Sequence, residues 1–171
     1  MTLIKSISGI RGIIDTSLTL ETIKRYVSAF SDISPQGTIV LARDTRDSGE
    51  NFITHSISLL NRLNRSSINC GIIPTPTAQL LIEKNKYAGG IVFTASHNPS
   101  DWNGIKFINS NGIFINHEEF NELENKVDEI NLKEYDINIE KKDYSDQSIN
   151  THINNILDLD IIDKEKIKNQ N

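Results

Sequence analysis

The strongest constraint on the fold is an alternation of strand-like and helix-like segments between residues 19 and 93. Short runs rich in apolar residues at 38–42, 67–73 and 87–93 are typical of buried strands. Apolar side chains at helical spacing precede the first run (Leu20, Ile23, Val27 and Phe30) and separate it from the second (Phe52, Ile53, Ile57 and Leu60). Between the second and third runs, the prolines of Pro74-Thr75-Pro76-Thr77 suit a helix start, and Leu80, Leu81 and Ile82 follow as its apolar contacts. An order of strand, helix, strand, helix, strand predicts βαβ units, and therefore an α/β fold whose sheet is largely parallel.

Two further patterns flank this unit. Residues 4–12 predict a short strand that enters a glycine-flanked turn. Asn103-Gly104 is typical of a tight turn, and the apolar runs 105–108 and 112–115 that follow it indicate a hairpin.

Ser96 and His97 lie where the strand at 87–93 passes into a polar loop, and Pro99 stiffens this loop just after them. A serine beside an imidazole can act as a nucleophile or accept a phosphate. A serine at a strand end also commonly bonds the backbone, and these residues alone leave both interpretations open. Because the carboxyl ends of parallel strands share one edge of a sheet, Arg43 and Ser96 are predicted to converge.

The run Thr94-Ala95-Ser96-His97-Asn98-Pro99 resembles the phosphoserine loop of the α-D-phosphohexomutases, the family of phosphoglucomutase, phosphomannomutase and phosphoglucosamine mutase. Three more stretches match motifs of this family in the same order, namely Ser8-Gly9-Ile10-Arg11-Gly12, Arg43-Asp44-Thr45-Arg46-Asp47-Ser48-Gly49 and Asn103-Gly104-Ile105-Lys106. The opening residues are most similar to bacterial phosphoglucosamine mutases and phosphomannomutases. The resemblance is close from Ile4 to Val127 and looser beyond.

The resemblance implies a three-layer α/β/α domain with a mixed, mostly parallel four-stranded sheet, which is the first of the four domains of such an enzyme. Residues 1–130 are predicted to form this domain. Residues 131–171 are predicted to form a connector with helices that leads toward a second domain outside this sequence. Domains II to IV of the full-length enzyme are the expected protein partners.

The resemblance also implies an isomerase that moves phosphate between the 1- and 6-positions of a hexose or hexosamine through a bisphosphate intermediate. Ser96 then carries the phosphoryl group, and Arg11 contacts phosphate or assists proton transfer. Lys106 is a candidate general acid or base, His97 orients the phosphate by hydrogen bonding, and Asn98 contributes to substrate binding.

Mg²⁺ is the implied cofactor, and the phosphate on Ser96 is its one predicted ligand in this sequence. The family holds the metal with an Asp-Gly-Asp-x-Asp-Arg motif of the second domain, and this motif does not occur here. The domain is therefore expected to present Ser96 but to lack useful turnover alone. Asp44 and Arg46 are interpreted as structural residues that brace neighbouring loops by ion pairs.

Two alternatives to a mutase remain open. A serine hydrolase could use Ser96 and His97, although the sequence lacks the Gly-x-Ser-x-Gly elbow. A non-catalytic phosphate- or partner-binding domain could carry the same loop, and Ser96 would then not be phosphorylated.

Charge, hydrophobicity and cysteine content bear on the partners and the location of the protein. A net charge of −5 without a basic stripe argues against a nucleic-acid partner, and no apolar run reaches the length needed to span a membrane. Cys70 is the one cysteine, and its apolar surroundings predict a buried thiol, which suits a reducing cytosol. The N-terminal residues lack the apolar core of a signal peptide, so we expect a cytoplasmic location.

Overall fold

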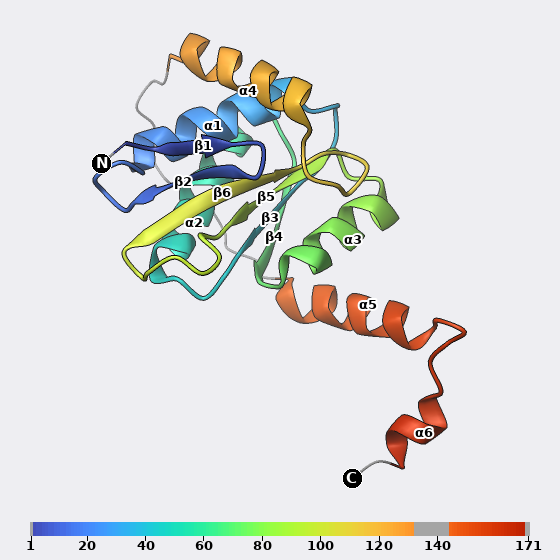
Figure 1. Cartoon of the computed structure of the whole chain (residues 1–171). Coiled ribbons are helices and arrows are strands. Elements are labelled where there is room, and N and C mark those ends of the chain that lie inside the picture. The colour runs from blue at the N-terminus through green and yellow to red at the C-terminus, as the bar shows by residue number, and fades with distance from the viewer. Residues whose placement is uncertain (1, 132–143, 170–171) are drawn as a thin grey trace.

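Figure 1 shows the computed structural model, which describes residues 2–131 and 144–169. Within these residues a mixed six-stranded sheet has the order β1-β2-β6-β5-β3-β4. The strands are β1 (Ile4–Ser6), β2 (Gly9–Ile13), β3 (Ile39–Arg43), β4 (Ser67–Ile72), β5 (Gly89–Phe93) and β6 (Trp102–Ile108). The helices are α1 (Leu20–Ile33), α2 (Asp47–Arg62), α3 (Thr75–Asn85), α4 (His117–Glu129), α5 (Ser145–Leu157) and α6 (Lys164–Lys168).

The predicted βαβ units form one half of the sheet. Strand β3 pairs in parallel with both β4 and β5, and helices α2 and α3 make the two crossovers. This confirms the three-layer α/β/α class and the mixed sheet. The predicted number of four strands is wrong, because residues 4–12 form a hairpin that extends the sheet through antiparallel pairing of β2 with β6.

The predicted turn at Asn103-Gly104 is also wrong. Both residues lie inside β6, where Gly104 pairs with Arg11. A Cβ atom on Gly104 would lie 2.4 Å from the Ile10 carbonyl oxygen and 3.0 Å from that of Thr94, so the glycine allows close packing of neighbouring backbone. The hairpin predicted after it is reduced to a single bridge between Ile108 and Phe114.

Alternating side chains of the strands supply two apolar layers, one on each face of the sheet. Helices α1, α2 and α4 cover the face that carries Leu41, Ile91 and Phe107. Helix α3 covers the opposite face, where Val40 and Cys70 are buried. The predicted burial of the Cys70 thiol is therefore confirmed.

Helix α5 lies against α3 through two side-chain hydrogen bonds. Thr77 Oγ1 and His152 Nδ1 are 2.6 Å apart, and Lys84 Nζ donates to Asn155 Oδ1 at 2.8 Å. The division of the chain at residue 130 stays a prediction, since most of the polar segment after it lies outside the described residues. Among the described residues, no helix combines the length and apolar character that crossing a bilayer requires.

Candidate active site at the Ser96 loop

Ser96 lies in a tight loop directly after β5, at the carboxyl end of the parallel strands. Its φ of 56° is a left-handed backbone conformation that residues with a side chain seldom adopt. Two hydrogen bonds within the loop support it, from the Ser96 N–H to Thr94 Oγ1 (3.0 Å) and from the Asn98 N–H to the Ala95 carbonyl (3.1 Å). Ser96 itself is exposed, as a residue that reacts with a dissolved ligand must be.

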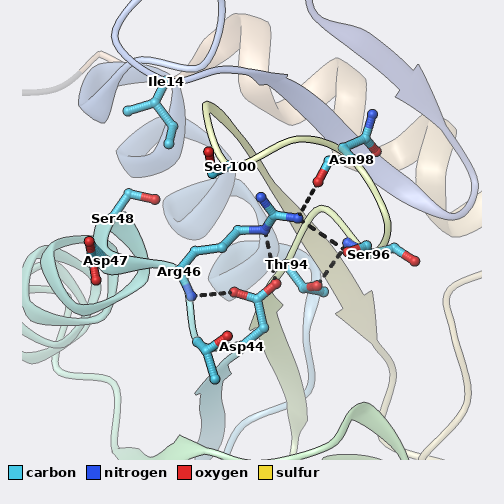
Figure 2. Close-up of a pocket in the computed structure, with 10 residues that line it drawn as sticks. Ile14, Asp44, Arg46, Asp47, Ser48, Thr94, Ser96, Asn98 and Ser100 are labelled. Carbon is cyan, nitrogen blue, oxygen red and sulfur yellow. Dashed lines mark hydrogen bonds and ion pairs between the residues drawn. The ribbon is translucent and has the colours of Figure 1, made fainter.

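The connection between β3 and α2 braces this loop from one side. The Arg46 guanidinium donates to the Asp44 carboxylate and to the backbone carbonyls of Ser96 and Asn98, as Figure 2 shows. The predicted bracing role is confirmed for Arg46, although the loop is held by hydrogen bonds to its carbonyls, and the ion pair joins Arg46 to Asp44.

Arg43 pairs with Phe93 at the ends of β3 and β5, three residues before Ser96, so the backbones of the two strand ends converge as predicted. The Arg43 guanidinium itself binds Glu50 and the Asp44 carbonyl.

The β1–β2 hairpin brings Arg11 to the loop from the other side. Arg11 pairs with Gly104, and Lys106 follows Gly104 by two residues, so Arg11 and Lys106 lie on the same face of the sheet. A Cβ atom on Gly104 would lie 2.9 Å from Arg11 Cγ, which means that the glycine leaves room for the arginine. Arg11 Nη1 reaches over it and donates to Asn98 Oδ1 at 3.3 Å.

Four of the five predicted site residues share one small cavity, which we call the basic cavity. Its volume is about 110 Å³, and its lining consists of Ser8, Ile10, Arg11, Thr94, Ala95, Ser96, His97 and Lys106. Asn98, the fifth, does not line it but contacts Arg11. Among the described residues, two cationic side chains and no carboxylate line this cavity, so its charge suits an anion beside the Ser96 hydroxyl.

His97 lies at the edge of hydrogen-bond distance from Ser96. Its Nδ1 atom is 3.4 Å from Ser96 Oγ, and both residues are exposed. A general base that takes a hydroxyl proton normally lies about 2.6–3.2 Å from it, although contacts in a ligand-free site can be longer. The geometry therefore gives little support to a Ser96–His97 hydrolase pair.

An aromatic ring that the sequence analysis did not single out holds Lys106. The Lys106 Nζ atom lies 5.1 Å from the centre of the Phe114 ring, a distance typical of a cation–π contact. Lys106 is half-buried, whereas Phe114 keeps 38% of its surface exposed. The ring therefore contacts the ammonium group of a residue that lines the basic cavity, and the ring itself stays partly open to solvent.

A larger cavity of about 620 Å³ lies on the α2 side of the same loop, and we call it the hydroxyl cavity. It shares Ser96 and Thr94 with the basic cavity, and its lining further includes Ile14, Asp44, Thr45, Arg46, Asp47, Ser48, Asn98 and Ser100 (Figure 2). Two carboxylates and a single arginine line it, so it lacks the cationic character of the basic cavity.

The described residues do not build a magnesium site on their own. Within residues 2–131 and 144–169, no group of three or more His, Cys, Asp or Glu side chains could hold a metal ion. In the basic cavity, the charged neighbours of Ser96 are Arg11 and Lys106, whereas a hard divalent cation such as Mg²⁺ prefers oxygen ligands. This cavity therefore supplies no further ligand for the metal beside a phosphate on Ser96.

A comparison with protein families identifies the family to which this chain belongs. The family model described as phosphoglucomutase/phosphomannomutase, alpha/beta/alpha domain I, matches residues 3–134, which is more than half of the chain. The chain belongs to the phosphoglucomutase/phosphomannomutase family.

Individual relatives agree with this phosphoglucomutase/phosphomannomutase assignment. A phosphoglucosamine/phosphogalactosamine mutase from Sulfurisphaera tokodaii is 32% identical over 166 residues, which cover 95% of this chain and 36% of the relative. A phosphoglucosamine mutase from Prochlorococcus marinus subsp. pastoris is 38% identical over 117 residues, which cover 68% of this chain and 26% of the relative. The chain thus spans between about a quarter and just over a third of the length of these relatives.

Solved structures place the fold in the same family. The crystal structure of a putative phosphomannomutase from Thermus thermophilus matches 73% of this chain and 30% of its own, with a TM-score of 0.69 and 29% sequence identity. The predicted family and the predicted domain type are therefore confirmed.

Proposed function

We propose that this chain is the serine-bearing domain of a phosphohexomutase that interconverts the 1- and 6-phosphates of a hexose or hexosamine. The observation that carries the proposal is the exposed Ser96 hydroxyl in a cavity that it shares with Arg11 and Lys106. A phosphoserine brings a charge of about −1.5 to −2 at neutral pH, and two nearby cations compensate it. The names of the relatives support the hexosamine class of substrate most directly.

The proposed reaction balances as two transfers of one phosphoryl group. The phosphate on Ser96 moves to a free sugar hydroxyl, which loses its proton and leaves Ser96 with its own hydroxyl restored. The resulting sugar bisphosphate reorients, and its other phosphoryl group returns to the Ser96 oxygen, so the sugar phosphate is isomerised and the enzyme is regenerated. Such transfers depend on positioning and on neutralisation of charge.

The chain's own residues have separate roles in this proposal. Arg11 and Lys106 bind the phosphate on Ser96, and Lys106 is also the candidate for moving the proton of the sugar hydroxyl. Asn98 orients Arg11 through their hydrogen bond. His97, whose Nδ1 atom lies 3.4 Å from Ser96 Oγ, orients the phosphate after it has been attached.

Mg²⁺ remains a proposed cofactor, and when bound it would supply further neutralisation of the phosphate charge. Because the described residues hold no carboxylate cluster for it, its remaining ligands must come from outside them. We propose for the same reason that this domain can accept a single phosphoryl group on Ser96 but needs other parts of a mutase, such as domains II to IV, for repeated turnover of sugar phosphate. A cytoplasmic location stays a prediction.

The proposal is tested by incubating the chain with glucose 1,6-bisphosphate and, separately, with glucosamine 1,6-bisphosphate in the presence of Mg²⁺. Intact-mass analysis should show one added phosphoryl group, and peptide sequencing should place it on Ser96. Ser96→Ala should abolish the addition, whereas Ser100→Ala, a change in the same loop, should not.

Two outcomes would contradict this proposal. Absence of a phosphoryl group from the wild-type chain would favour a non-catalytic binding domain. Labelling of Ser96 by a fluorophosphonate probe without phosphorylation would favour a serine hydrolase.

A further inference from the structure

We infer that Arg46 is a positioning residue for phosphoryl transfer, which holds the Ser96 loop in its reactive conformation but does not bind the phosphate itself. The inference rests on the proposed function for the chemistry and on the contacts of Arg46 for the geometry. The residues matched by the family model include Arg46, but nothing in that match assigns it a role.

The guanidinium of Arg46 has no donor left for a ligand. Arginine has five N–H donors in a rigid planar arrangement. In Arg46, Nε donates to Asp44 Oδ2 (3.1 Å), Nη1 to the carbonyls of Pro99 (2.7 Å) and Trp102 (3.0 Å), and Nη2 to the carbonyls of Ser96 (3.1 Å) and Asn98 (2.8 Å). Every donor is therefore used within the protein.

These bonds gather four carbonyls of one loop around one side chain. Carbonyl groups that point toward a common centre repel one another, so the loop needs a donor group at that centre to keep this shape. The Ser96 carbonyl is one of the four, and Ser96 has the left-handed φ of 56°. Arg46 therefore compensates the energetic cost of the conformation that exposes the Ser96 hydroxyl.

Asp44 fixes Arg46 in turn. Its carboxylate accepts from Arg46 Nε and, at 3.0 Å, from the backbone N–H of Arg46, and the Arg46 side chain is only 13% exposed. The ion pair neutralises the guanidinium, so Arg46 adds little net charge at Ser96. The charge that stabilises a phosphate must then come from Arg11 and Lys106, on the other side of the loop.

The first test measures the order of the loop in the chain without any ligand. Arg46→Lys keeps the charge but offers at most three donors from a single atom, and Arg46→Met keeps the length of the side chain without donors. In both variants, we expect the Ser96, Asn98 and Trp102 amides to exchange their hydrogens at least about tenfold faster, while the amides of β5 keep their protection.

Trp102 provides a second readout of the same loop, because it is the only tryptophan of the chain. Its fluorescence emission should shift in both Arg46 variants. The matched control is Arg25→Lys, which alters an exposed ion pair with Glu21 on α1 and should leave the loop exchange and the emission unchanged. Unchanged exchange and emission in a folded Arg46→Lys variant would overturn the inference.

The second test measures phosphoryl transfer from glucose 1,6-bisphosphate to Ser96. A misplaced reactive group can slow a reaction by about 100-fold, so Arg46→Lys should lower the maximal rate by one to two orders of magnitude. The concentration of bisphosphate at half-maximal rate should stay within about twofold, since Arg46 does not touch the phosphate. A rise in that concentration with an unchanged maximal rate would identify Arg46 as a phosphate ligand and overturn the inference.

The two tests separate this inference from the proposed function. If the wild-type chain accepts no phosphoryl group, the proposed function fails, together with the catalytic part of the inference. The hydrogen exchange of the loop still decides whether Arg46 holds Ser96 in place.

Discussion

The two sides of the Ser96 loop use the same kind of side chain in opposite ways. On the α2 side, Arg46 donates all its hydrogen bonds to loop carbonyls and to Asp44. On the hairpin side, the Arg11 guanidinium makes one hydrogen bond within the described residues, to Asn98, and Arg11 lines the basic cavity with Lys106. An arginine that is fully bonded within the protein fixes geometry, whereas one with donors to spare can bind an anion.

The comparison also applies to the cavities. Within the described part of the chain, the basic cavity beside Arg11 has two cations and no carboxylate in its lining, and the larger hydroxyl cavity beside Arg46 has two carboxylates and one paired cation. Both include Ser96. The structure therefore favours an anion on Ser96 that points toward the hairpin side. Substitutions on one side of the loop at a time test this difference.

Gly104→Ala should have the largest effect, because it disrupts the hairpin side through backbone collisions. The new Cβ atom would lie 2.4 Å from the Ile10 carbonyl oxygen and 2.9 Å from Arg11 Cγ. We expect the free energy of unfolding to fall by about 3 kcal/mol in urea titrations. Asn111→Ala, at an exposed loop position, should cost less than about 0.5 kcal/mol, and an equal loss in both variants would contradict the close-packing argument.

Arg11→Met should have the next largest effect and should leave the loop intact. Losing a hydrogen-bonded cation at an anion costs about 1.5–3 kcal/mol, or about 10- to 100-fold in the affinity of the chain for glucose 1,6-bisphosphate. Titration calorimetry measures this affinity, and hydrogen exchange of the Ser96 loop should stay at the wild-type rate. Faster loop exchange in Arg11→Met would show that the two arginines do not differ in role.

Phe114→Leu should have a smaller effect on the same side. It removes the ring that lies 5.1 Å from Lys106 Nζ, and an exposed cation–π contact contributes about 0.5–1 kcal/mol. We expect a two- to fivefold weaker affinity for the same bisphosphate, by the same calorimetry. Phe114→Tyr keeps a ring and should bind as the wild type does; equal weakening in both variants would indicate that the ring does not act through Lys106.

The smallest effect concerns His55 of α2, on the Arg46 side. Burial, and then the charge of Lys24, lower the pKa of His55 from its ordinary value of 6.5. Between the lowered pKa and about pH 6.5, the native state therefore binds fewer protons than the unfolded chain. The free energy of unfolding is highest above about pH 6.5 and falls as the pH drops through the lowered pKa. Urea titrations of the wild type should show this loss. His55→Gln should reduce it, and His117→Gln, an exposed control, should not.

The sequence predicts the parallel half of the sheet well, because each of its elements has a local pattern. The apolar runs that become β3, β4 and β5 and the helical spacing between them are all visible in the chain. The antiparallel half is different, since β1 and β2 are short and rich in small residues. The pairing of β2 with β6 joins residues about ninety positions apart, such as Arg11 and Gly104, and no local sequence pattern reports such a contact.

The candidate site likewise contains residues that sequence motifs reveal and contacts that they do not. Ser96, His97, Arg11 and Lys106 are found through contiguous motifs, and the structure brings all four to one cavity. Asn103-Gly104 carries a turn signal, but the glycine is explained by Arg11 crossing over it. Two other features depend on tertiary packing and cannot be read from the local sequence. They are the hydrogen bonds of Arg46 to a loop about fifty residues away and the contact of the Phe114 ring with Lys106.

The most direct test of the account is a phosphorus NMR titration of the chain carrying phosphate on Ser96. Free phosphoserine has a second pKa of about 6, and cations close to it favour the dianion. We predict a second pKa of about 5 or lower in the wild type, with a return toward the free value in the Arg11→Met, Lys106→Met double variant. A titration that is identical in the two proteins would show that these cations do not stabilise a phosphate on Ser96, and would contradict the account.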